Sequence, residues 1–182
     1  MRITLRHTAT TGLIALAALT TPAFAQKGGA HGTGPDCGLT ATADWGGDPA
    51  SGLSAAAVTT CEDDGRIWAT LSLTNAASAR VYEGRYPTDE VMVLAWAEPG
   101  QLAASLDEWL IAFTQLDNTI HLPPENAEFP FYPVEGLTQA DIDALRTEGR
   151  DMACYIQGME SAMCLLRDGD GVREIGVWLF PG

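Results

Sequence analysis

Histidine is the side chain that most often moves protons at neutral pH, and this chain of 182 residues has three of them. Only His121 lies in a segment that is predicted to fold. A hydrolytic triad would need a serine beside this imidazole and a carboxylate behind it. The sequence has no G-x-S-x-G motif to hold a serine on a strained turn. His121 is therefore predicted to be an ordinary loop residue, and no catalytic residue is assigned.

Paired carboxylates offer a second route to catalysis, because two of them flanking a cleft can hydrolyse a glycosidic bond. Asp107 and Glu108 precede Trp109 in a predicted helix, and Glu125 and Glu128 lie in a proline-rich stretch. With 24 acidic residues in the chain, some fall beside an aromatic ring by chance. An exported hydrolase that uses such a pair is kept as the alternative function.

The run Asp168-Gly169-Asp170-Gly171 has the spacing of the first two ligands in a calcium-binding EF-hand loop. The fifth and twelfth positions of that loop would be Val172 and Leu179, whose side chains carry no oxygen. The run is therefore predicted to be a hairpin turn. Methionines near the last two cysteines could hold Cu(I), but methionines in strands more often fill the core. No metal or other cofactor is predicted.

The four cysteines, Cys37, Cys61, Cys154 and Cys164, form neither a CxxC motif nor a cluster with histidine pairs, which makes zinc the weaker interpretation. An even number of cysteines in an oxidising compartment favours two disulfides. In a hairpin centred on Met159, residue 154 faces residue 164, because paired positions sum to a constant. The predicted bridges are Cys154 with Cys164 and, by a looser form of the same argument, Cys37 with Cys61.

The N-terminus has the pattern of an export signal. Two arginines precede an apolar run at residues 12–19, and Ala23-Phe24-Ala25 supplies a small-x-small cleavage site. A transmembrane helix needs about 20 apolar residues, which this run does not reach. Residues 1–25 are predicted to be a signal peptide, residues 26–36 a flexible leader, and the mature protein periplasmic or secreted. No later segment is apolar enough to span a membrane, so no membrane association is expected after cleavage.

The charge of the chain narrows the class of partner. The full sequence carries 24 acidic and 10 basic side chains, a net charge of −14. Removing Arg2 and Arg6 with the signal peptide leaves 24 against 8, or −16. Such a field repels nucleic acid and anionic membranes and attracts cationic partners. The sequence therefore predicts no nucleic-acid partner and favours a cationic protein or peptide.

The first half of the chain is rich in predicted strands. Residues 37–45, 55–61 and 66–74 alternate apolar and polar side chains, and the third is the clearest period-2 segment. Residues 79–82 form a short candidate strand. Residues 90–97 are apolar on both faces, which predicts a strand in the centre of a sheet.

The second half combines helices with a β-meander. An apolar stripe predicts a helix over 101–115, and Thr138 with Asp141 resembles a capping box that begins a helix over 139–148. The last 30 residues are predicted to form three strands separated by turns, of which the final one is central. Residues 118–122 are a further candidate strand. Together these elements predict one α+β domain over 37–182, with a mainly antiparallel sheet and two short helices.

A stiff aromatic loop between Pro123 and Pro133 is the feature least explained by core packing. Its aromatic residues are Phe129, Phe131 and Tyr132, with Glu125 and Glu128 beside them. Aromatic anchors on a rigid loop with an acidic rim are typical of protein contact surfaces. The alternative is that these rings cover one edge of the sheet. The leading hypothesis is an exported acidic binding module, such as an inhibitor, chaperone or envelope-complex subunit, for a cationic protein or peptide.

Overall fold

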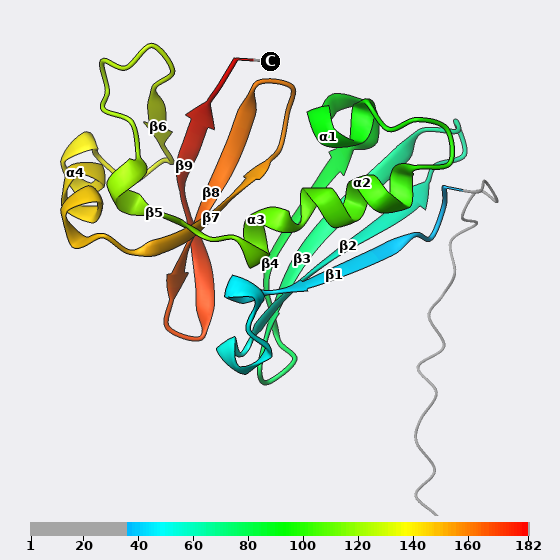
Figure 1. Ribbon diagram of the computed structural model, residues 1–182, viewed down its shortest axis with the longest axis horizontal. Coiled ribbons are helices and arrows are strands. Elements are labelled where there is room, and N and C mark those ends of the chain that lie inside the picture. The colour runs from blue at the N-terminus through cyan, green and yellow to red at the C-terminus, as the bar shows by residue number, and fades with distance from the viewer. Residues whose placement is uncertain (1–35, 182) are drawn as a thin grey trace, which may run out of the picture.

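The computed structural model describes residues 36–181, and these form an α+β fold with two antiparallel sheets (Figure 1). The predicted fold class is therefore confirmed, although the strands divide between two sheets. The first sheet has four strands and the second has five. The signal peptide predicted over 1–25, and all of the predicted leader except Asp36, lie outside the described residues.

The first sheet is a meander whose strands lie side by side in sequence order. Its strands are β1 (Thr40–Asp44), β2 (Leu53–Cys61), β3 (Ile67–Asn75) and β4 (Arg80–Pro87). In β2 every second side chain is buried, from Leu53 to Cys61, as the alternation predicts. In β3 the same face contributes Ala69, Leu71 and Leu73, none of which is exposed. The short strand predicted at 79–82 corresponds to β4, which is longer and extends to Pro87.

The strand predicted over residues 90–97 is wrong. The chain forms a 3₁₀ turn at Thr88–Glu90 and then the short helix α1, Met92–Ala95. Val91 and Leu94 are buried side by side at helical i, i+3 spacing, whereas Trp96 is largely exposed. A short apolar run has no periodicity that separates a buried strand from a helix turn, and here the helix covers the core.

The helix predicted over 101–115 is present but divides in two. Helix α2 covers Leu102–Trp109 and helix α3 covers Ile111–Thr114, with Leu110 as the boundary residue. The predicted apolar stripe is buried throughout: Leu102, Leu106, Trp109, Leu110 and Phe113. This stripe packs the helices against the first sheet and the neighbouring edge of the second (Figure 1).

The second sheet has the order β5-β7-β8-β9-β6. Its strands are β5 (Asp117–Asn118), β6 (Phe131–Pro133), β7 (Asp151–Ile156), β8 (Ser161–Asp168) and β9 (Gly171–Leu179). The predicted terminal meander is confirmed as β7 to β9, and β9 lies inside the sheet as expected. The candidate strand at 118–122 is only the two-residue β5, followed by a 3₁₀ turn at Thr119–His121.

The prediction that the aromatic segment is entirely a loop is wrong for its last residues. Phe131 pairs with Trp178 and Tyr132 with Val177, so β6 forms an edge of the second sheet. Pro133 ends this strand, and an edge strand tolerates a residue that has no backbone N–H.

Helix α4, Gln139–Glu148, begins with the predicted capping box. The Thr138 hydroxyl accepts a hydrogen bond from the backbone N–H of Asp141, and the Asp141 carboxylate accepts one from the backbone N–H of Thr138. The helix ends at Gly149 in the left-handed conformation. Ile142 and Leu145 are its buried side chains, and they lie on the second sheet.

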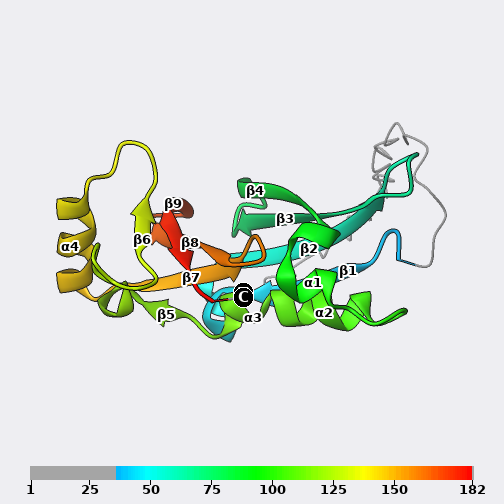
Figure 2. The ribbon, with the colours of Figure 1, turned by 90° about the horizontal axis from the view of Figure 1, so that it is seen from above.

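Two apolar cores hold these elements. The larger core takes buried side chains from both sheets and from α2 and α3, including Tyr155 of β7. The smaller core lies between α4 and the second sheet, around Met152, Cys164 and Phe131. Figure 2 shows the two sheets beside each other along the long axis, with α4 at one end. The larger core is thus shared by both sheets, while the single domain over 37–182 stays a prediction.

Both predicted disulfides are present. Cys37 is joined to Cys61, with their Cα atoms 5.5 Å apart, and Cys154 to Cys164, with their Cα atoms 4.0 Å apart. Cys154 and Cys164 are direct partners across β7 and β8, as the hairpin register predicts. No free cysteine is found in the described part of the chain.

Candidate functional site

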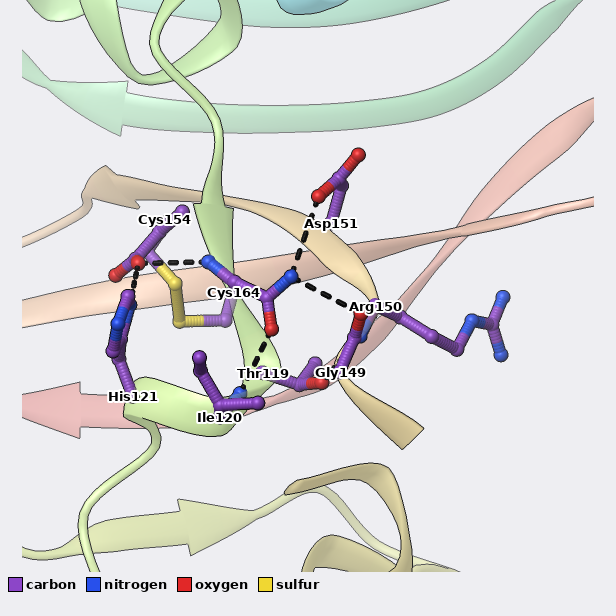
Figure 3. Close-up of polar contacts among 10 residues, drawn as sticks. Thr119, Ile120, His121, Gly149, Arg150, Asp151, Cys154 and Cys164 are labelled. Carbon is purple, nitrogen blue, oxygen red and sulfur yellow. Dashed lines mark hydrogen bonds and ion pairs between the residues drawn. A yellow bond between two sulfur atoms is a disulfide. The ribbon is translucent and has the colours of Figure 1, made fainter. Parts of the chain in front are cut away.

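His121 lies at the edge of the second sheet and pairs with Asp117. The imidazole Nδ1 is 2.6 Å from Asp117 Oδ1, and the ring is largely exposed (Figure 3). Within residues 36–181, this carboxylate is its only hydrogen-bonding or ionic partner. The imidazole and the carboxylate form a hydrogen bond at the surface, and no serine among residues 36–181 hydrogen-bonds to the ring.

Next to this pair, Asn118 connects β5 to the residues that precede β7. Its Oδ1 accepts a hydrogen bond from the backbone N–H of Ile120, at 3.1 Å. Its Nδ2 donates to the carbonyl of Gly149, at 3.1 Å, and to Asp151 Oδ1, at 3.4 Å (Figure 3). Because these bonds join the end of α4 to the short strand, the cluster around His121 holds the structure together at this edge.

The carboxylates proposed for a hydrolase do not come together. Asp107 and Glu108 are exposed on α2, whereas Glu125 and Glu128 are exposed in the loop before β6, at the opposite end of the molecule (Figures 1 and 2). Trp109, the aromatic neighbour of the first pair, is buried and donates from Nε1 to the carbonyl of Ile156 at 2.5 Å.

The acidic run that resembles a calcium loop is a hairpin turn, as predicted. Asp168 pairs with Gly171, so only two residues connect β8 to β9. Residues 36–181 contain no group of three or more His, Cys, Asp or Glu side chains that could hold a metal ion.

The aromatic segment before β7 contributes less surface than its composition suggests. Phe131 is only 2 % exposed and belongs to the smaller core, so it cannot contact a partner. Tyr132 is 55 % exposed, because neighbouring side chains of a strand point to opposite faces. Phe129, Glu125 and Glu128 are exposed as well. Phe131 is therefore removed from the residues proposed to bind a partner. The remaining candidates in this segment are Glu125, Glu128, Phe129 and Tyr132.

An apolar groove lies on the second sheet, between its open face and the helices α1 and α3. It consists of a pocket of about 680 Å³ and an adjoining pocket of about 320 Å³. The two pockets share Ala112, Cys154 and Ile156 as lining residues, so they form one continuous depression. Residues that line only one of them include Met92, Val93, Ile111, Trp178 and Phe180.

The groove is open because α4 covers only part of one sheet face. Met152, Cys154 and Ile156 of β7 point to the same face, since side chains alternate along a strand. Met152 is buried beneath α4, whereas Cys154 and Ile156 lie further along and line the groove. On the helix side, Ile111 is 44 % exposed. An apolar face without a covering element is typical of a binding surface.

Acidic side chains accompany this apolar lining. Glu108 lines the smaller pocket and Asp117 the larger one, and no Arg, Lys or His of the described residues lines either. All 24 acidic residues of the chain lie within 36–181, against seven arginines there, because Arg2, Arg6 and Lys27 precede this range. The groove therefore combines an apolar floor with a negative surrounding field.

Sequence reasoning missed this groove. The residues that line it were assigned to the interiors of central strands: Met92 to a strand that does not form, and Trp178 to a strand with two apolar faces. The available signal was β9 itself, whose two apolar faces require two covering layers. One face contacts the larger core through Val177, and the other forms part of the groove.

Behind the groove, a cluster of tyrosines connects the two sheets. Tyr155 Oη lies 2.5 Å from the hydroxyls of Tyr82 and Tyr86, and Tyr82 also donates to Glu174 at 3.0 Å. Tyr86 folds back over Gly84, where a Cβ atom would lie 2.5 Å from its hydroxyl. Burial raises the pKa of Tyr155, and the nearby tyrosines raise it further. The buried Tyr155 hydroxyl therefore keeps its proton at physiological pH, and the cluster is a hydrogen-bonded connection between the sheets.

Within residues 36–181, no helix combines the length and the hydropathy needed to cross a bilayer. The chain matches no protein-family model, no curated protein and no solved structure.

Proposed function

We propose that the protein is an exported, non-enzymatic binding module that holds an apolar and positively charged segment of a partner protein in the groove on its second sheet. The observation that carries this proposal is the continuous apolar depression through Ala112, Cys154 and Ile156, with acids and no bases in its lining. The N-terminal export pattern and the two disulfides support a periplasmic or extracellular site of action.

Charge complementarity defines the occupant. A peptide in this groove buries apolar side chains against Ile156, Trp178 and Phe180, which supplies the affinity. Basic residues flanking those side chains meet Glu108 and Asp117 at the rim and the negative field around them. An acidic peptide would be repelled over a distance of about 8 Å at physiological salt. The preferred ligand is therefore a cationic amphipathic segment.

A display library of random peptides tests this proposal, because it offers the groove segments of every composition. The purified protein, with both disulfides formed, should enrich peptides that combine basic with large apolar residues. Binding of the enriched peptides is then measured for two variants, Ile111→Lys and Ile120→Lys. Both isoleucines are exposed, by 44 % and 53 %, but only Ile111 lines the groove.

Ile111→Lys should weaken binding at least tenfold, about 1.4 kcal/mol, because it places on the apolar wall a positive charge that repels the cationic peptide. Ile120→Lys adds the same charge on the 3₁₀ turn after β5 and should leave the affinity within about twofold. Failure to enrich cationic peptides, or equal losses in the two variants, would show that the groove is not the binding site.

A further inference from the structure

A second pocket, of about 740 Å³, has a different chemistry from the groove. It lies where the 3₁₀ turns at Trp45–Gly47 and Pro49–Ser51 meet the beginning of β7 and the end of β8. Its charged lining residues are Arg150, Arg167, Asp48 and Asp151. Ligand pockets in proteins span roughly 300 to 1,000 Å³, so its size suits a small molecule.

The two arginines are oriented by uncharged groups. Arg150 Nη2 donates to the carbonyl of Arg167 at 2.5 Å, and Arg167 Nη2 donates to the carbonyl of Ser51 at 2.8 Å. A carbonyl fixes the direction of a guanidinium without cancelling its charge. Both side chains are therefore held in place while their positive charge stays available to a ligand.

Three of the seven arginines in residues 36–181, Arg150, Arg167 and Arg173, lack a close carboxylate partner. Four of the seven arginines in residues 36–181 contact a carboxylate directly: Arg66, Arg80, Arg85 and Arg146. The nearest carboxylate to Arg150 belongs to Glu148 and is 3.9 Å away, and Arg167 has no ion pair among the described residues. Two of the three arginines without a close carboxylate therefore line the same pocket, in a segment with 24 acids and seven arginines.

The carboxylates of the same pocket are also unpaired with any cation in the described part of the chain. Asp48 Oδ1 accepts from the backbone N–H of Ala50 at 2.9 Å, and Asp151 Oδ1 from Asn118 Nδ2 at 3.4 Å. Figure 3 shows the side chains of Arg150 and Asp151 pointing in different directions. Positive and negative groups thus line one pocket without neutralising each other.

We infer that this pocket binds a small zwitterion, a free α-amino acid, whose carboxylate pairs with Arg150 and Arg167 and whose ammonium group pairs with Asp48 and Asp151. A guanidinium fork matches a carboxylate in charge and geometry. A phosphate carries more negative charge and meets the two aspartates unfavourably. The inference is independent of the proposed groove, with which this pocket shares only Leu116.

Isothermal titration calorimetry of the oxidised protein tests the ligand class. The probes are L-alanine, L-leucine, L-glutamine and L-phenylalanine, compared with acetate, methylammonium and inorganic phosphate. At least one amino acid should bind about tenfold more tightly than each of the three simple ions, because only the zwitterion satisfies both kinds of charge. If no amino acid binds, or if phosphate binds more tightly than all of them, the inference is overturned.

Matched variants test the residues. Arg150→Gln should weaken amino-acid binding about tenfold or more, since a charge-assisted pair is lost. Arg173→Gln is the control, because Arg173 is 37 % exposed against 39 % for Arg150, and its nearest carboxylate is also 3.9 Å away. Asp151→Asn should weaken binding of the amino acid but leave binding of acetate unchanged. Each titration is run below that variant's own unfolding temperature, so that loss of folding is not mistaken for loss of binding.

Equal losses of affinity in Arg150→Gln and Arg173→Gln would show a general effect of net charge. Arg150 would then not be a ligand of the amino-acid carboxylate, and the inference would be overturned. Ile111→Lys, which alters the groove, should leave amino-acid binding intact. A negative result for peptide binding in the groove can therefore be distinguished from a negative result for amino-acid binding in this pocket.

Discussion

The hydroxyl of Tyr155, on β7 of the second sheet, lies 2.5 Å from the hydroxyl of Tyr82, on β4 of the first. Tyr86, also on β4, approaches the same oxygen at 2.5 Å, and Tyr155 is fully buried. Because these hydroxyls belong to different sheets, their bonds fix how the sheets meet within the larger core.

Replacing Tyr155 by Phe should lower the free energy of unfolding by about 1 to 3 kcal/mol, because the hydroxyls of Tyr82 and Tyr86 then lose a buried partner. Tyr132→Phe removes a hydroxyl from an exposed ring and should change stability by no more than about 0.5 kcal/mol. Urea unfolding of the two variants provides the comparison. Equal stabilities would mean that water replaces the buried bonds at no cost.

Stability should also fall at alkaline pH. The pKa of Tyr155 is raised above its ordinary value of 10.0, mainly by burial, so the folded protein keeps a proton that the unfolded chain releases. The stabilisation is complete below pH 10 and decreases as the pH rises further, by about 1.4 kcal/mol per pH unit for each such group. Unfolding free energies measured from pH 8 to pH 11 should show a shallower decline in Tyr155→Phe than in the wild type.

Gly176 is predicted to tolerate no side chain. A Cβ atom at this position would lie 2.4 Å from the carbonyl oxygen of Tyr132 and 2.5 Å from the ring of Phe131. Gly176→Ala should therefore separate β6 from β9 and cost about 1 to 3 kcal/mol. At Gly171, in the same strand, the added atom would lie 3.5 Å from Val81, an ordinary contact. Gly171→Ala should be nearly neutral in thermal unfolding, and a similar loss in both variants would contradict the steric explanation.

Phe131 and Tyr132 are adjacent but should respond to truncation in opposite ways. Phe131→Ala leaves a cavity in the smaller core and should cost about 3 to 5 kcal/mol of stability. Tyr132→Ala should leave the melting temperature almost unchanged. Only Tyr132→Ala can then report on a partner surface, through faster dissociation of a bound peptide. If the peptide dissociates from Tyr132→Ala at the wild-type rate, Tyr132 does not contact it, and the contact residues must lie in the groove.

The two disulfides should contribute unequally. The Cys37–Cys61 bridge spans 24 residues and the Cys154–Cys164 bridge spans 10, and loop entropy predicts about 3 kcal/mol for each, slightly more for the longer loop. Replacing the first pair by Ser should lower stability only. Replacing the second should also impair peptide binding, because Cys154 lines the groove. Calorimetry with and without the enriched peptide separates the two effects.

The features that follow from local rules could be predicted from the sequence. The Cys154–Cys164 register depends only on symmetry about Met159, and the beginning of α4 depends on Thr138 and Asp141, three residues apart. Both rest on neighbours along the chain, and both are confirmed.

The sites depend on tertiary packing, which local patterns do not encode. Met92 and Val93 lie in an apolar run whose helical state is fixed by the core beneath it, so the helix side of the groove could not be predicted from the sequence. The charged pocket joins residues as distant in sequence as Asp48 and Arg167. The exposure of Tyr132 beside the buried Phe131 follows from the pairing of β6 with β9, which proline-rich composition conceals.

The order of strands in the two sheets has a kinetic consequence. Strands β1 to β4 pair only with their neighbours in sequence; β7, β8 and β9 also pair in sequence order, and the short strands β5 and β6 add to the two edges of that meander. Such low-contact-order units form quickly, because only short loops must close. The hydroxyl bonds of Tyr155 need strands from both units and so belong to a later step. Refolding should thus proceed from two independent meanders to a docking event, with the rate of that last step set by the packing around Tyr155.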